Sequence, residues 1–131
     1  MPYEIKKLTP NLIVSSVEQS LAFYCDVLGF TKTGTVPDET PYVFAMVQSG
    51  PVEIFFNARG PAIEEYPALA GLAIGGTLTL YMEVSGVEKI YDELKGRVNV
   101  TMPLEKKFYG VTEFAFTDPD GYVITFGERT A

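Results

Sequence analysis

Histidine is absent from the 131 residues of this chain, and this absence restricts its chemistry more than any other feature of its composition. Imidazole is the commonest metal ligand in proteins and the commonest general base near neutral pH. Ser-His and Cys-His catalysis are therefore excluded. Any enzyme built from this sequence has to use Glu, Asp, Tyr or Lys.

The chain also has a single cysteine and no long apolar run. Cys25 is the single cysteine of the chain, so no internal disulfide forms, which favours a reducing cytoplasm. We interpret Cys25 as a helix residue without a catalytic role. The first ten residues lack the apolar core of a signal peptide, and no apolar run reaches the length of about 18 residues that a membrane span needs. We therefore expect a cytoplasmic protein that does not bind a membrane.

Positive charge is limited. The chain has 10 Lys and Arg against 17 Asp and Glu, a net charge of −7, and no basic stripe. Nucleic-acid binding needs clustered Lys and Arg to neutralise phosphates, so we expect no nucleic-acid partner. An acidic chain is soluble and weakly attracts cationic ligands.

The sequence contains a repeat that begins with the stretch Leu8–Phe30. Its second version starts at Leu78, in register with Leu8. In this register Thr9 recurs as Thr79, Val14 as Val84, Ser15 as Ser85, Val17 as Val87 and Glu18 as Glu88. Each version reads as an apolar strand, a Ser that caps a helix, and a short amphipathic helix closed by Gly. A repeat of about half the chain predicts one supersecondary unit used twice.

The first unit begins with a predicted strand over Lys7–Val14, in which Pro10 favours an edge position or a late start. A helix follows, capped by Ser15 or Ser16, with a capping box completed by Glu18 or Gln19. Gly29 ends that helix in the left-handed conformation. The core-facing residues of the helix are Val17, Leu21, Tyr24 and Leu28. Three further strands are predicted over Lys32–Val36, Tyr42–Gln48 and Val52–Asn57.

The second unit repeats this order. A strand is predicted over Thr77–Val84, and Ser85 to Glu88 form a capping box. The helix after it buries Val87, Ile90, Tyr91 and Leu94, and it closes at Gly96. The remaining strands are predicted over Val98–Met102, Gly110–Thr117 and Tyr122–Phe126, with a tight turn at Asp118–Gly121 before the last.

These elements predict an α+β fold of two βαβββ modules, residues 1–59 and 77–131, in one domain. The linker 60–76 joins them, with a helical turn around Ile63–Tyr66. We expect a curved, mixed, eight-stranded sheet around a cavity. Helices should cover its apolar face, made of Leu8, Leu12, Val14, Leu78, Leu80, Met82 and Val84.

Three segments connect this pattern to a known family: Ser20–Phe30, Asp118–Tyr122, and Pro103 followed by Tyr109–Phe114. With the βαβββ repeat, they resemble the vicinal oxygen chelate superfamily, the group of glyoxalase I, bleomycin resistance proteins and extradiol dioxygenases. The resemblance covers nearly the whole chain and implies that superfamily's fold.

The resemblance also implies where a metal would bind. Metal-dependent members place one ligand on the first and the last strand of each module, and those positions here are Thr9, Glu53, Thr79 and Thr125. Only Glu53 keeps a metal-binding side chain. Three threonines and one carboxylate are a poor site for Zn²⁺, Ni²⁺ or Fe²⁺. We therefore predict no metal and no cofactor, which argues against glyoxalase and dioxygenase chemistry.

The same positions identify the face of the sheet that lines the cavity. Strand alternation and the family alignment predict a ligand-binding set of Thr9, Asn11, Glu53, Phe55, Asn57, Thr79, Tyr81, Glu113 and Thr125. Glu83 shares this face, but its place at a strand end favours a solvated role. Apolar walls with a few polar anchors are typical of small-molecule pockets.

The first hypothesis is a metal-independent binding protein similar to bleomycin resistance proteins. It would hold a small organic, cationic aromatic ligand by stacking on Phe55 and Tyr81 and by pairing with Glu53 or Glu113. The alternative is a lyase or isomerase of the glyoxalase type in which Glu53 is the catalytic base or a metal ligand. A third is a structural or regulatory partner with a filled cavity. The superfamily resemblance also implies a homodimer, which a sedimentation measurement of mass would test.

Overall fold

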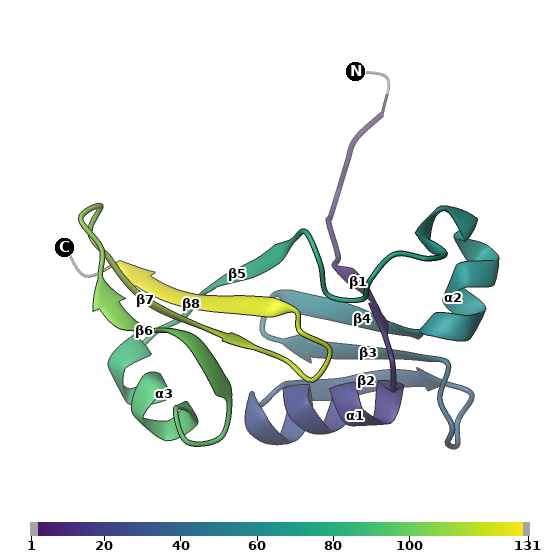
Figure 1. The fold of residues 1–131 in the computed structure, drawn as a ribbon, viewed down its shortest axis with the longest axis horizontal. Helices are drawn as coiled ribbons and strands as arrows, with labels where there is room; N and C mark the ends of the chain where they lie inside the picture. Colours follow the sequence, from purple (N-terminus) through teal and green to yellow (C-terminus); the bar gives the residue numbers. More distant parts are fainter. Residues whose placement is uncertain (1–2, 130–131) are drawn as a thin grey trace. The chain divides into compact units, whose positions relative to one another are not determined.

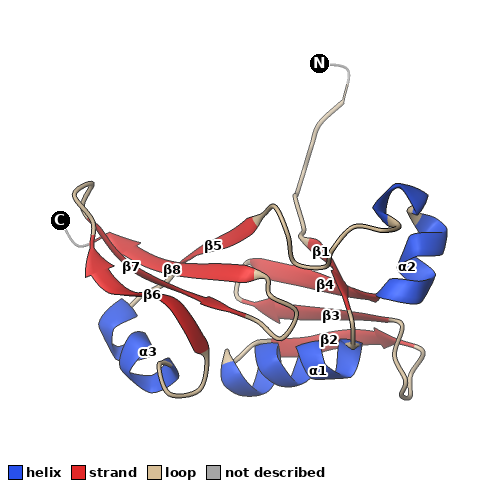
Figure 2. Cartoon of the chain, in the orientation of Figure 1, coloured by secondary structure: helices blue, strands red, loops and turns tan. Residues whose placement is uncertain are grey.

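The computed structural model describes residues 3–129, which form two compact units along the chain (Figures 1 and 2). Unit 1 ends at Leu72 and unit 2 begins at Ala73. In the part of the chain described, no helix has the length and apolar character needed to cross a membrane.

Unit 1 is a βαβββ module with an additional helix. Its elements are β1 (Asn11–Val14), α1 (Val17–Leu21) with a π-helical continuation (Ala22–Val27), β2 (Thr31–Val36), β3 (Phe44–Ser49), β4 (Val52–Ala58), α2 (Arg59–Glu65) and a 3₁₀ turn (Pro67–Leu69). The sheet order is β1-β4-β3-β2, with β1 parallel to β4 and the other pairs antiparallel. α1 packs against β3 and β4.

Unit 2 repeats the topology. Its elements are β5 (Thr79–Glu83), α3 (Val87–Leu94), β6 (Asn99–Lys106), β7 (Val111–Thr117) and β8 (Val123–Arg129). The sheet order is β5-β8-β7-β6, with β5 parallel to β8 and the other pairs antiparallel. α3 packs against β7 and β8. The α+β class with two βαβββ modules is confirmed, and its strands hydrogen-bond as two four-stranded sheets.

Each sheet buries one face under its helix. In unit 1, Tyr24 of the π-helical continuation contacts Phe30 and Phe56, with ring centroids 5.9 and 4.9 Å apart. In unit 2, Phe114, Phe116 and Phe126 form the corresponding cluster, with centroids 5.2 to 5.7 Å apart, and Tyr91 of α3 packs on it. Aromatic burial of this kind is a major source of stability in small domains.

Two residues expected on the helix-covered face lie outside it. Leu8 is 91% exposed and Leu78 is 43% exposed. β1 begins only at Asn11 and β5 at Thr79, so both leucines precede the paired part of their strands. The predicted alternation was wrong at these two positions, whereas the late start that Pro10 favours is observed.

Of the two predicted helix caps, one is observed and the other is not. The Ser16 hydroxyl accepts a hydrogen bond from the Gln19 amide at 3.1 Å and caps α1, as predicted. The capping box at Ser85 is wrong, because Gly86 occupies the N-cap of α3 with a φ of 80°. The carboxylate of Glu128 on β8 accepts hydrogen bonds from the amides of Gly86 and Val87, both at 3.0 Å. These two bonds lower the pKa of Glu128.

The stretch 60–76, expected as a linker, carries more structure than one turn. α2 covers Arg59–Glu65 and buries Ala62, and the 3₁₀ turn follows it. The guanidinium of Arg59 donates a hydrogen bond to the Leu72 carbonyl at 3.0 Å, which ties the end of unit 1 back to α2.

Candidate functional site

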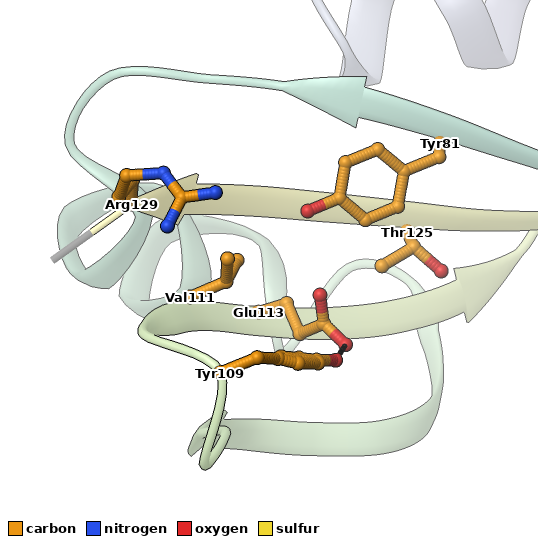
Figure 3. A pocket seen from close by; sticks show the side chains of 6 residues that line it. All are labelled: Tyr81, Tyr109, Val111, Glu113, Thr125 and Arg129. Carbon is orange, nitrogen blue, oxygen red and sulfur yellow. Dashed lines mark hydrogen bonds between the residues drawn. The ribbon is translucent and has the colours of Figure 1, made fainter.

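A cavity of about 450 Å³ lies on the face of the unit 2 sheet opposite α3 (Figure 3). Six residues line it: Tyr81 of β5, Tyr109 in the loop before β7, Val111 and Glu113 of β7, and Thr125 and Arg129 of β8. The register explains the grouping, since Tyr81 pairs with Thr125, Glu113 with Gly127, and Val111 with Arg129. Paired residues of neighbouring strands point to the same face of a sheet.

Glu113 is the buried charge of this cavity. The residue is only 8% exposed, and the Tyr109 hydroxyl donates a hydrogen bond to Oε1 at 2.6 Å (Figure 3). That hydrogen bond, with a smaller effect of burial, raises the pKa of Tyr109 to about 12. Tyr109 is protonated at neutral pH and donates its hydroxyl hydrogen to the carboxylate.

Tyr81 lies across the sheet, over a glycine. A Cβ placed on Gly127 would come within 2.9 Å of Cζ of the Tyr81 ring and within 3.3 Å of Cγ1 of Val111. The Tyr81 hydroxyl points toward the space between Glu113 and Arg129 (Figure 3). Burial of this hydroxyl, followed by the negative charge of Glu113, raises the pKa of Tyr81. The glycine thus makes room for a flat aromatic surface in the cavity.

A second cavity, of about 400 Å³, adjoins the first and shares Tyr81, Val111 and Arg129 with it. Its other lining residues come from the end of β5, the loop before α3, and β8: Glu83, Val84, Ser85, Gly127 and Glu128. The concave face of unit 2 is therefore larger than the first cavity alone.

The predicted site residues are divided between the two units. Tyr81, Glu113 and Thr125 line the first cavity, whereas Thr79 is exposed at the start of β5 and is not among the lining residues. Thr9, Asn11, Glu53, Phe55 and Asn57 lie in unit 1.

The unit 1 residues have partners of their own. The Asn57 amide donates a hydrogen bond to the Asn11 side chain, and Phe55 packs on Phe44 with ring centroids 5.3 Å apart. Glu53 forms an ion pair with Lys7, whose Nζ is 2.6 Å from Oε1. The Glu53 carboxylate is thus already occupied by a cation of the same chain.

Sequence reasoning missed Tyr109, Val111 and Arg129. Val111 has the same parity as Glu113 on β7, so strand alternation could have identified it. Arg129 was not predicted because the last strand was expected to end at Phe126, whereas β8 continues to Arg129. Tyr109 lies before β7, and no periodicity indicates where its ring points.

The four positions that the family alignment marks for a metal do not fit one here. Three of the four are threonines, and the only carboxylate among them, that of Glu53, is paired with Lys7. Within residues 3–129, no group of three or more Cys, Asp or Glu side chains is arranged to hold a metal ion. Hydroxyl groups of threonine are weak ligands for the transition metals that these positions would have to bind.

Comparisons with known proteins agree with this architecture. The model of the Glyoxalase/Bleomycin resistance protein/Dioxygenase superfamily matches residues 6–126. A bleomycin resistance protein from Geobacillus stearothermophilus is 28% identical over 130 residues, covering 92% of this chain and 94% of the relative. A solved structure from Sphaerobacter thermophilus, a member of the same superfamily, is 26% identical with a TM-score of 0.74, covering 95% of this chain and 98% of that chain. A protein of unknown function from Agrobacterium tumefaciens has a TM-score of 0.77 at 23% identity, covering 96% and 95% of the two chains.

Proposed function

Because this chain belongs to the Glyoxalase/Bleomycin resistance protein/Dioxygenase superfamily, we propose that it binds a small organic ligand with a flat, cationic group in the first cavity of unit 2, without a metal. Its distant relation to bleomycin resistance proteins supports a ligand of this class. A binding role needs no catalytic base, so the absence of histidine is compatible with it.

The observation that carries the proposal is the environment of Glu113. The carboxylate is buried in an open cavity, and its hydrogen-bond donor is a neutral phenol, Tyr109. Among residues 3–129, no lysine or arginine forms an ion pair with it. A buried carboxylate is stabilised by a cationic partner, and the cavity lets such a partner enter from outside.

Aromatic surface surrounds this carboxylate. Tyr81 is 54% exposed and Tyr109 is 46% exposed, so both rings are available for stacking. Phe108, the residue before Tyr109, packs against it with ring centroids 5.1 Å apart. A flat cation between such rings gains both stacking and cation–π attraction, which add to its pairing with Glu113.

The alternative hypothesis, a lyase or isomerase with Glu53 as the base, has less support. The ion pair with Lys7 would have to open before Glu53 could accept a proton from a substrate. Glu53 also lies outside both cavities of unit 2. The binding proposal therefore depends on Glu113 rather than on Glu53.

Isothermal titration calorimetry at low salt tests the proposal, with bleomycin and benzylamine as probes. We expect saturable binding that weakens as salt increases, because the contact is charged. Glu113→Gln keeps the shape of the side chain and removes its charge, and it should weaken binding by about tenfold or more.

The matched control is Glu93→Gln, which removes one negative charge from the exposed surface of α3. It changes the net charge by the same one unit as Glu113→Gln but should leave the affinity unchanged. Equal affinity of the wild type and Glu113→Gln for both probes, or no binding of either probe, would refute the proposal.

A further inference from the structure

We infer that the second cavity of unit 2 is a second cation-binding subsite, so that the ligand carries two cationic centres, one at Glu113 and one at Glu83. This inference rests on the proposed function, because it assumes that the first centre binds at Glu113. It assigns Glu83 a role in binding instead of the solvated role that its strand-end position suggested.

The register of the sheet places the two carboxylates in one row. Gly127 of β8 pairs with Glu83 of β5 on one side and with Glu113 of β7 on the other. Side chains of such a row point to the same face, and Glu83 lines the second cavity while Glu113 lines the first. The two carboxylates therefore flank one glycine on the concave face.

Tyr81 fills the space between them. Because Gly127 has no side chain, the Tyr81 ring occupies the position that a Cβ would take above the middle of the row. The negative charges of Glu113 and Glu83 both raise the pKa of the Tyr81 hydroxyl, which is consistent with a place between the two. An aromatic or aliphatic spacer could lie on this ring, with a cationic group at each end.

The charges of the lining favour two cations over one. Three carboxylates, of Glu83, Glu113 and Glu128, face the two cavities together with one guanidinium, that of Arg129. Glu128 is occupied by the two amides at the start of α3. Among residues 3–129, neither Glu83 nor Glu113 has an ion-pair partner. Two carboxylates thus remain to pair with a ligand.

The row also limits the length of the ligand. Neighbouring strands lie about 4.8 Å apart, so the backbones of Glu83 and Glu113 are separated by two such spacings, about 10 Å. Flexible carboxylates can reach inward from these positions. A compact diamine with a single ring between its ammonium groups therefore fits better than a long polyamine.

Two probes that differ by one ammonium group test the inference: p-xylylenediamine and p-methylbenzylamine. In calorimetry at low salt and neutral pH, the wild type should bind the diamine about three- to fivefold more tightly, the gain of one exposed ion pair. Glu83→Gln should reduce this advantage to about twofold, the statistical factor of a probe with two equivalent ammonium groups, without changing the affinity for the monoamine. Glu113→Gln should weaken the binding of both probes, and Glu93→Gln should change neither.

The outcomes separate the two proposals. An advantage of no more than about twofold for the diamine in the wild type, or a loss of the same size for both probes in Glu83→Gln, would overturn the second subsite and leave the proposed function intact. Binding of neither probe to the wild type would overturn both. Glu83 is exposed, so its substitution does not endanger folding, and a thermal melt of the variant checks this.

Discussion

The hydrogen bond from Tyr109 to Glu113 makes a prediction that needs no ligand. The hydrogen bond to the Glu113 carboxylate is the largest cause that raises the pKa of Tyr109 from 10.0 to about 12, and burial and the charge of Glu113 add to it. At pH 11 a tyrosine with a pKa of about 10 is roughly 90% ionised, whereas one with a pKa of about 12 is roughly 10% ionised. The substitution Glu113→Gln removes the charged acceptor, so the pKa of Tyr109 should fall back toward 10.

The assay is the ultraviolet absorbance of tyrosinate as a function of pH. At pH 11 the Glu113→Gln protein should show more ionised tyrosine than the wild type, by up to about 0.8 per chain for Tyr109, out of eight tyrosines. Tyr81 adds to this difference with the same sign, because the charge of Glu113 also raises its pKa. Far-UV circular dichroism at the same pH checks that the fold persists.

Two variants control this experiment. Glu93→Gln removes a surface charge and should titrate like the wild type. In a Tyr109→Phe background, Glu113→Gln should produce a smaller gain, since only Tyr81 remains to respond. Identical titration curves for the wild type and Glu113→Gln would contradict the hydrogen bond and the role given to Glu113.

The raised pKa of Tyr109 also makes the free energy of unfolding depend on pH, in a direction that follows from the shift. A raised pKa means that the protonated Tyr109 favours the folded state. This contribution is fully present below the ordinary tyrosine pKa of about 10, and it is lost as the pH rises through about 12.

Three further predictions concern stability and the shape of the site. Glu128→Gln should lower the melting temperature at neutral pH by weakening the cap of α3. Because the native pKa of Glu128 is lowered, the gap between the wild type and this variant should shrink as the pH falls below about 4.5 through that pKa; a gap independent of pH would contradict the cap. Phe56→Ala should cost about 3–5 kcal/mol in urea unfolding, because Phe56 is fully buried against Tyr24. Gly127→Ala should change the free energy of unfolding by no more than about 1 kcal/mol, since the exposed Tyr81 ring can move aside. The same substitution should weaken binding of p-xylylenediamine, because it displaces that ring. Unchanged binding would show that the ligand does not need Tyr81 in its position over the glycine.

The sequence predicted the order of the elements because local signals determine it. The period of the apolar residues, Gly29 after the first helix and the turn at Asp118–Gly121 all act over a few residues. In the structure the Asp118 carboxylate accepts hydrogen bonds from the amides of Asp120 and Tyr122, which closes that turn locally.

The errors came from interactions between distant residues. The alternation of the strands was extended to Leu8 and Leu78, but both residues are exposed because pairing with the neighbouring strand begins only after them. The cap of α3 comes from Glu128, at the far end of unit 2, and no local pattern around Ser85 indicates it.

In the candidate site too, local patterns predicted some residues, and contacts that depend on the fold decided the others. Alternation along the strands identified Tyr81, Glu113 and Thr125, which the register brings together. It could not reveal that Tyr109 turns back to donate to Glu113, because this contact depends on the conformation of a loop.

The central position of β8 has a consequence for synthesis on the ribosome. β5 leaves the ribosome well before β8, the strand to which it is hydrogen-bonded in the described sheet. The start of α3 likewise lacks its capping carboxylate until Glu128, on β8, has been synthesised. In unit 1 the corresponding central strand, β4, ends at Ala58, so that sheet can assemble while the rest of the chain is still being translated. In unit 2 the edge of β5 stays unpaired with β8 until the residues up to Arg129 have been synthesised, which leaves an exposed strand edge in the nascent chain.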